Sequence, residues 1–186
     1  MTLRPHARNF KLLGWLWGAF FVCASVSQGV VAQQTCLSDT ASMSLELFHD
    51  NGDGTVTDME TKLMWMRCPS GQNWLGQRCI GVAHGYGWLE TKQYADKVNR
   101  DGDAFFSDWR VPSLRELATI TDRGCVNPRT NLSVFPDTPA APFWSSTPRP
   151  GESSGERFLA LSFGVEGVVL ARKDERFHVR LVRTGP

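Results

Sequence analysis

Segments in which apolar and polar residues alternate predict that much of the chain forms β-strands, because side chains along a strand point to opposite faces in turn. Residues 157–171 alternate on both sides of a turn at 164–167. Over residues 177–181 the odd positions are apolar, whereas the even ones are His178 and Arg180. The C-terminal part is therefore expected to be β, with His178 and Arg180 on one face of its last strand.

Turn-forming residues predict a hairpin nearer the N-terminus. Residues 50–54 are Asp-Asn-Gly-Asp-Gly, and residues 55–57 are Thr-Val-Thr. Glycine after Asn or Asp, next to residues that favour strands, is typical of a hairpin. The apolar run at 63–66 predicts a further, buried strand, and residues 143–144 predict a short one.

Two segments have the period of a helix. Between residues 88 and 100, Leu89, Ala95 and Val98 recur at helical spacing, and Gly102 can end this helix in the left-handed conformation.

The second helix is expected from residue 114 to about 121. Ser113 and Glu116 before it fit a capping box, in which each side chain satisfies a backbone amide of the other residue. Its apolar face consists of Leu114, Leu117 and Ile120.

The order of strands, two short helices and strands predicts an α+β fold with an antiparallel β-sheet. Residues 124–156 interrupt this order with six prolines and little periodicity. A long irregular segment in a compact domain is usually functional or is tied down by other contacts.

Composition and charge narrow the function classes. Of the 186 residues, 41% are hydrophobic and 21% are charged, which is ordinary for a globular protein and argues against long disorder. The formal net charge is +1, so the overall charge gives no reason to expect nucleic acid as a partner.

Residues 1–32 have the features of a secretory signal peptide. Basic residues precede an apolar run at 12–26, and small residues follow it up to Ala32. A spanning helix needs about 20 apolar residues, so we expect cleavage and no stable membrane span afterwards, with a retained anchor as the alternative. Residues 33–44 are expected to be a tether and residues 45–184 to form one domain. The mature protein is expected in the periplasm, in the medium or on the cell surface.

Four cysteines follow the predicted signal peptide, and an even number in an exported chain favours disulfides. Of three connectivities we favour Cys68–Cys79 with Cys36–Cys125, because the first pair brackets a Pro-Ser-Gly-Gln-Asn segment that can turn back on itself. A zinc site is the alternative, but the sequence has no Cys-x-x-Cys motif.

Four blocks of sequence occur in an order that is known from one family. They are Phe-x-Asp-Asn-Gly-Asp-Gly-Thr-Val-Thr-Asp at 48–58 with Leu-Met-Trp at 63–65, Asp-Trp-Arg-Val-Pro-Ser at 108–113 with Glu116-Leu117, Phe-Trp-Ser-Ser-Thr at 143–147, and Val-Arg-Leu-Val-Arg at 179–183. Together these blocks resemble the Lcl C-terminal domain family over about residues 45–184. Val111 and Ser113 stand where Leu and Thr are commoner in that family.

The resemblance implies a domain of secreted bacterial proteins whose function is largely unknown and which occurs in a collagen-like adhesin. It implies glycan or surface binding, as in one characterised member, and no shared catalytic site. Its motifs are also similar to those of C-type-lectin-like and sulfatase-modifying-factor folds, which implies a lectin-like architecture by analogy. The sequence contains no collagen-like Gly-x-y stalk, so the adhesin architecture is not carried over.

The turn at 50–58 offers hard oxygen ligands, which Ca²⁺ prefers. The candidate metal ligands are Asp50, Asn51, Asp53 and Asp58. An EF-hand register anchored on residues 53–54 places His49 where the first carboxylate is needed, so a plain hairpin turn is the alternative. No other cofactor is expected.

Two further features are candidates for ligand binding. Trp74 lies between Cys68 and Cys79 among polar residues and is expected to be exposed, whereas Trp65, Trp109 and Trp144 are expected to be buried beside strands. Basic residues near the C-terminus could form a strip that holds sulfate or carboxylate groups. We call these residues the basic cluster: Arg172, Lys173, Arg176, His178 and Arg180. A solvated hairpin edge is the alternative, since acidic residues interrupt the run.

No enzyme is expected, because the sequence lacks the common nucleophile, metalloprotease and phosphate-loop motifs. We expect an exported binding module for acidic or sulfated glycans or another envelope component. One alternative is a structural or assembly protein of an envelope or pilus complex, which would bind another protein. A second is an uncharacterised hydrolase, which would need two close carboxylates in a cleft. The oligomeric state is left open.

Overall fold

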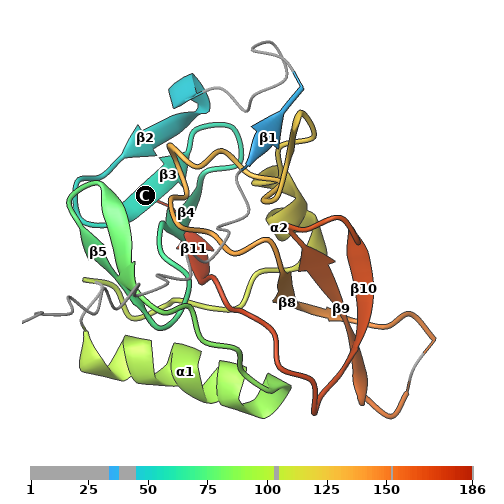
Figure 1. Ribbon diagram of the computed structural model, residues 1–186. Coiled ribbons are helices and arrows are strands. Elements are labelled where there is room, and N and C mark those ends of the chain that lie inside the picture. The colour runs from blue at the N-terminus through green and yellow to red at the C-terminus, as the bar shows by residue number, and fades with distance from the viewer. Residues whose placement is uncertain (1–33, 38–44, 103–104, 152, 186) are drawn as a thin grey trace, which may run out of the picture. The chain divides into compact units, whose positions relative to one another are not determined.

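The computed structural model describes residues 34–37, 45–102, 105–151 and 153–185 (Figure 1). The described residues belong to one compact unit. The predicted signal peptide lies outside the described residues, and so do residue 33 and residues 38–44 of the predicted tether.

A four-stranded antiparallel sheet with the order β11-β4-β3-β2 contains the predicted hairpin. Its strands are β2 (Phe48–Asp50), β3 (Thr55–Asp58), β4 (Leu63–Met66) and β11 (Val182–Thr184). The hairpin and the buried strand at 63–66 are therefore confirmed. The C-terminal strand β11 pairs with β4, so the two ends of the domain meet in one sheet.

The predicted strand at 177–181 is not part of a ladder. Phe177 forms an isolated bridge with Tyr86, and His178 forms one with Phe143. The carbonyl groups of Val179 and Leu181 accept hydrogen bonds from Ser70 and Met66 instead. The segment thus connects several elements, and both of its faces are covered.

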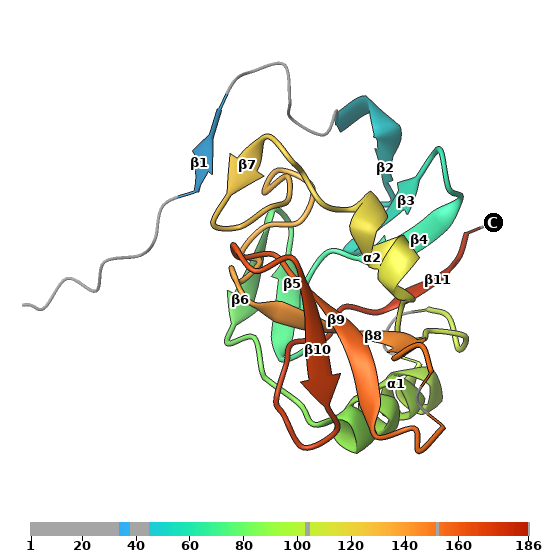
Figure 2. The ribbon, with the colours of Figure 1, turned by 90° about the vertical axis from the view of Figure 1, so that its right-hand side faces the viewer.

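A three-stranded antiparallel sheet with the order β10-β9-β8 forms the second layer of strands (Figure 2). Its strands are β8 (Pro142–Pro148), β9 (Arg157–Ser162) and β10 (Val168–Arg172). The strands and turn predicted at 157–171 are confirmed, and the strand predicted at 143–144 is the inner part of β8.

Two short pairs of strands are each closed by a disulfide. β5 (Gln72–Leu75) pairs with β6 (Arg78–Gly81), and β1 (Thr35–Cys36) pairs with β7 (Cys125–Val126). The structure contains both favoured disulfides, Cys68–Cys79 and Cys36–Cys125. The described part of the predicted tether is therefore held against the domain. A 3₁₀ turn, η1 (Leu45–Leu47), leads into β2.

Both predicted helices are present as α1 (Trp88–Asp101) and α2 (Leu114–Thr119). Gly102 ends α1 at φ 68°, a left-handed conformation that glycine adopts without a Cβ penalty. Ser113 and Glu116 form the predicted capping box. The buried face of α1 differs from the predicted one, because Leu89 is 68% exposed and Trp88 is buried in its place.

Two groups of buried apolar side chains form the core. One joins the four-stranded sheet to α2 and β8–β9, and the other joins α1 to β8, β9 and the 177–181 segment. Trp65, Trp109 and Trp144 are buried, as expected. The fold is α+β with antiparallel sheets and two helices, which confirms the predicted class. No helix among the described residues is long and apolar enough to cross a membrane.

Candidate functional site

The exposed members of the basic cluster are paired with carboxylates. Arg172 donates to both carboxylate oxygens of Asp174, at 2.9 and 3.1 Å, and this contact lowers the pKa of Asp174. Lys173 Nζ lies 3.0 Å from an oxygen of Glu156. Paired charges of opposite sign attract a distant anion less than a bare cluster does.

Arg176 and His178 are also engaged. Arg176 lies 2.9 Å from Glu90 and donates to the carbonyl of Gly85. His178 Nδ1 lies 3.1 Å from the carbonyl oxygen of His84, and burial lowers the pKa of this histidine.

Arg180 is buried, which corrects the prediction that it lies on an exposed strip. The residue is 1% exposed, and its guanidinium donates to the carbonyl groups of Met66 and Arg67 and to the Thr138 hydroxyl. The ring of Phe135 lies 4.8 Å from its guanidinium carbon. Burial lowers the pKa of Arg180 to about 9, so the side chain stays charged at neutral pH. Arg180 therefore holds the domain together and cannot meet an external ligand.

A depression of about 520 Å³ lies beside the exposed part of the basic cluster, and we call it the basic depression. It is lined by Ser154, Glu156, Arg157, Arg172, Lys173 and Asp174. Among the residues that the structure describes, no aromatic side chain lines this depression.

The candidate metal ligands form hydrogen bonds within the 50–58 turn and with the residues next to it. Asp50 accepts from the Gly52 amide and pairs with Arg67, while Asp53 accepts from the amide and hydroxyl of Thr55. Asn51 donates to the hydroxyls of Thr55 and Thr57, and Asp58 accepts from the amides of Glu60 and Thr61. Within the described ranges no group of three or more His, Cys, Asp or Glu side chains could hold a metal ion. The contacts explain these residue types as turn formers, and the calcium site stays a prediction.

A cleft of about 380 Å³ is lined by residues of the β2–β3 turn, the β5–β6 hairpin and α1. Its lining combines four aromatic side chains with amides and charged groups. We call it the aromatic cleft; the side chains used below are Asp53, Gln72, Asn73, Trp74, Tyr86, Tyr94, Lys97, Asp101 and Phe105. Of the site residues predicted from the sequence, Trp74 and Asp53 line this cleft.

Close packing fixes the position of the Trp74 ring. The guanidinium carbon of Arg67 lies 4.1 Å from the ring centroid, so the cation stacks on the indole. Gly54, with φ +91°, lies so close that a Cβ there would be 2.8 Å from two Trp74 atoms. Trp74 is half-buried as a result, rather than freely exposed as predicted.

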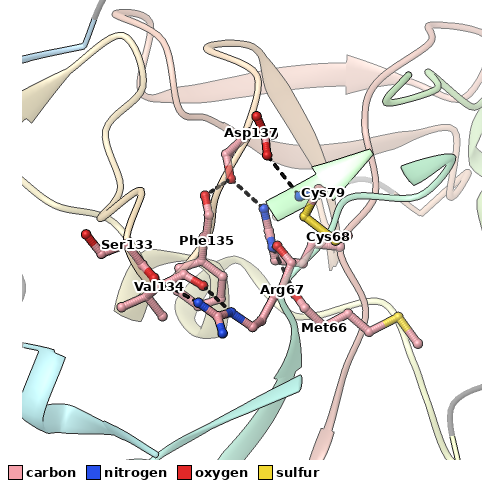
Figure 3. Close-up of a disulfide and its surroundings, with 10 residues drawn as sticks. Met66, Arg67, Cys68, Cys79, Ser133, Val134, Phe135 and Asp137 are labelled. Atoms are coloured by element: carbon pink, nitrogen blue, oxygen red, sulfur yellow. Dashed lines mark hydrogen bonds between the residues drawn. A yellow bond between two sulfur atoms is a disulfide. The ribbon is translucent and has the colours of Figure 1, made fainter. Parts of the chain in front are cut away.

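The hairpin that carries Trp74 is anchored to the domain through Cys79 in β6 and through the residues that precede β5 (Figure 3). Cys68, just before β5, is bonded to Cys79 in β6, and the Cys79 amide donates to Asp137 at 2.9 Å. Arg67 donates to the carbonyl groups of Val134 and Ser133 at 2.9 and 2.8 Å. The segment predicted as a loop between the cysteines is thus a braced β-hairpin.

The opposite wall of the aromatic cleft comes from α1 and the segment before it. The rings of Tyr86 and Tyr94 lie 5.4 Å apart at an angle of 33°. Burial, and secondly Tyr86, raise the pKa of Tyr94 to about 12, so its hydroxyl remains a neutral donor and acceptor at physiological pH. Lys97 and Asp101 form an ion pair at the end of this wall.

Sequence analysis missed Tyr86, Tyr94 and Phe105 as members of the site. The available signal was weak: Tyr94, Lys97 and Asp101 follow helical spacing on α1. Their position opposite Trp74 depends on tertiary packing, which no local pattern indicates.

The aromatic cleft has the properties of a binding site for a small, partly apolar molecule with many hydroxyl groups. Aromatic rings offer flat apolar surfaces, and the surrounding amides and charged groups offer hydrogen bonds that orient a ligand.

A sequence model of the Lcl C-terminal domain matches residues 54–183. No curated protein matches the chain.

Proposed function

The chain belongs to the Lcl C-terminal domain family, and we propose that it is an exported binding module that holds a glycan in the aromatic cleft. The family is associated with secreted, adhesin-like proteins and has no established function. Two disulfides fit a protein that matures outside the cytosol.

One observation carries the proposal: Trp74, Tyr86, Tyr94 and Phe105 converge with carboxamides and charged groups on one cleft. The faces of a sugar ring expose C–H groups, and its edges expose hydroxyl groups. An aromatic ring packs against the first, and carboxylate, amide or ammonium groups bond to the second. Because Arg67 and Gly54 fix the ring of Trp74, little side-chain entropy is lost on binding.

The charges in the aromatic cleft favour an uncharged glycan over a sulfated one. Asp53 and Asp101 line it beside one cation, Lys97. A sulfated or acidic glycan would instead use the basic depression, where Arg172 and Lys173 are paired with carboxylates.

A glycan array tests the proposal when the wild type is compared with Trp74→Ala. The expected result is binding by the wild type and a loss of at least about tenfold in affinity for the variant, roughly 1.4 kcal/mol. Leu75→Ala is the matched control, because Leu75 is the next residue of β5, is 57% exposed and does not line the cleft. Equal binding by wild type and Trp74→Ala, or binding to sulfated glycans alone, would contradict the proposal.

Two carboxylates line the aromatic cleft, and glycoside hydrolases use a carboxylate pair. Each one already has a structural contact, because Asp53 accepts from Thr55 and Asp101 pairs with Lys97. We therefore propose binding without hydrolysis. Chromatography of an N-acetylglucosamine hexamer after long incubation with the protein is expected to show no shorter products.

An apolar edge favours a second candidate function, the binding of another envelope protein. β10 is an outer strand of its sheet, and its Val168 and Leu170 are 57% and 45% exposed, while Val165 in the turn before it is 70% exposed. An open strand edge with apolar side chains can pair with a strand of another protein. Pull-down from an envelope extract with wild type and Val168→Lys distinguishes this function, since a partner held at the edge would be lost with the variant while glycan binding persists.

A further inference from the structure

The aromatic cleft does not end at the tyrosines. A second depression of about 490 Å³ continues along α1 and is lined by Tyr86, Glu90, Gln93, Tyr94, Lys97 and Arg176. Tyr86, Tyr94 and Lys97 line both hollows, so the two are contiguous. We call the combined surface the α1 groove.

One face of α1 forms the floor of the α1 groove. Glu90, Gln93, Lys97 and Asp101 follow each other at intervals of three or four residues, which places them in one row on the helix. Eleven residues separate the first from the last, and at 1.5 Å of rise per residue the row is about 16 Å long. This length exceeds a single sugar ring several-fold.

The charges along the row are arranged in pairs of opposite sign. Lys97 pairs with Asp101 near one end, and Arg176 lies 2.9 Å from Glu90 near the other. Arg176 is held in place by the carbonyl of Gly85, to which it donates at 2.7 Å. Each pair offers both donors and acceptors to a hydroxyl-rich ligand, while neither adds a net charge that would attract a polyanion.

Flat apolar surfaces also repeat along the groove. Trp74 and Phe105 lie in the first hollow, and the Tyr86–Tyr94 pair stands where the two hollows meet. A linear chain of sugar rings presents apolar faces and hydroxyl edges repeatedly along its length, which matches this repetition.

We propose that the α1 groove binds a linear, uncharged polysaccharide along the length of the chain rather than a single sugar or a chain end. One unit packs on Trp74, the next units lie across Tyr86 and Tyr94, and a distal unit bonds to Gln93 and the Glu90–Arg176 pair. This inference rests on the proposed function and adds the class of ligand and its direction along the helix.

Calorimetric titration with a ladder of defined oligosaccharides tests the inference. The probes are the monomer, dimer and hexamer of β-1,4-linked N-acetylglucosamine and of β-1,4-linked glucose, together with a heparin-derived hexamer. For at least one neutral ladder, affinity is expected to rise by at least about tenfold from dimer to hexamer, since distant contacts are then used.

Two variants test whether the distal part of the groove, rather than α1 in general, contributes to binding of the longer oligosaccharide. Gln93→Ala is expected to remove most of the gain between dimer and hexamer while leaving the dimer affinity unchanged. Lys92→Ala is the matched control, because Lys92 is the exposed neighbour on α1 that lines neither hollow of the groove, and it is expected to bind like the wild type.

The outcomes separate the two proposals. Equal affinity for dimer and hexamer, or an unchanged hexamer affinity in Gln93→Ala, overturns the extended groove and leaves the glycan-binding cleft standing. Preference for the heparin hexamer over both neutral hexamers overturns the claim that the ligand is uncharged. Absence of binding by every probe overturns the proposed function itself, and this inference with it.

Discussion

The aromatic cleft and the basic cluster differ in what lies beside their charged side chains. In the basic cluster, Arg172 and Lys173 lie against carboxylates, and Arg180 is enclosed by carbonyl groups. In the aromatic cleft the charged groups are engaged as well, Lys97 with Asp101 and Asp53 with Thr55, but the rings of Trp74 and Tyr94 lie beside them. The density of like charges along a sequence is thus a poor guide to a binding site, because folding brings in opposite charges from distant segments.

Substitution of Arg180 is expected to have the largest effect. If Arg180 bound a ligand, the contrast between the aromatic cleft and the basic cluster would not hold. Arg180→Ala removes hydrogen bonds to three groups and leaves a void in the core, so the free energy of unfolding should fall by about 3–5 kcal/mol. Urea unfolding measures this loss. Full stability together with weaker binding to heparin would contradict the structural role assigned to Arg180.

Removal of the Cys68–Cys79 disulfide is expected to have the next largest effect. Replacing both cysteines by serine should lower the free energy of unfolding by about 3 kcal/mol, as the chain-entropy model gives for a loop of this size. It should also weaken glycan binding, because the bridge braces the hairpin that carries Trp74. Removal of Cys36–Cys125, which is not part of the aromatic cleft, is the control and should leave the glycan affinity of the folded protein unchanged. The same affinity loss in both variants would show that bracing of the hairpin is not the cause.

Glu116 shows what an ion pair contributes when it is partly buried. Arg110 donates to both of its oxygens at 2.9 and 2.6 Å, which lowers the pKa of Glu116 from its ordinary value of 4.5 to about 2. A carboxyl group whose pKa is lower in the folded state than in the unfolded state stabilises the fold at pH values above the unfolded-state pKa. For Glu116 this contribution is lost as the pH falls from 4.5 toward 2. Because solvent screens the pair, Glu116→Gln should cost about 1 kcal/mol at pH 7.

Urea unfolding of Glu116→Gln between pH 7 and pH 2 checks this pH dependence. The difference from the wild type should shrink toward the acid end. Asp174→Asn is the control, since the Arg172–Asp174 pair is 70% exposed on both sides and should show no measurable loss at any pH. If the free energies of unfolding of Glu116→Gln and the wild type differed by the same amount at every pH from 7 to 2, ionisation of Glu116 would not be the source of the stabilisation.

The double substitution Arg172→Ala/Lys173→Ala should have the smallest effect. Asp174 and Glu156 already neutralise the two cations, so retention on a heparin column should change little relative to the wild type. Elution of the variant at a much lower salt concentration would indicate that an acidic glycan binds in the basic depression. The basic cluster, rather than the aromatic cleft, would then be the binding site.

Local patterns predicted most elements because the forces behind them are local. The hairpin at 50–57, the capping box at 113–116 and the left-handed Gly102 each depend on residues within one turn. Burial of Trp65 and Trp144 followed from their place beside strands.

The remaining errors concern contacts between distant segments. A two-residue period predicted that His178 and Arg180 share the outer face of a strand, but it could not indicate that both lie against Phe143, and Arg180 also against Phe135. In the same way, no local pattern pairs Arg176 with Glu90.

The most direct test of the account is amide chemical-shift mapping of the isotope-labelled wild-type protein during titration with an N-acetylglucosamine hexamer. The account predicts shifts confined to residues 53–55, 71–74, 86, 90–101, 105 and 176, which line the α1 groove or lie next to lining residues. Shifts confined to residues 154–157 and 172–174, or no shifts at saturating hexamer, would contradict it.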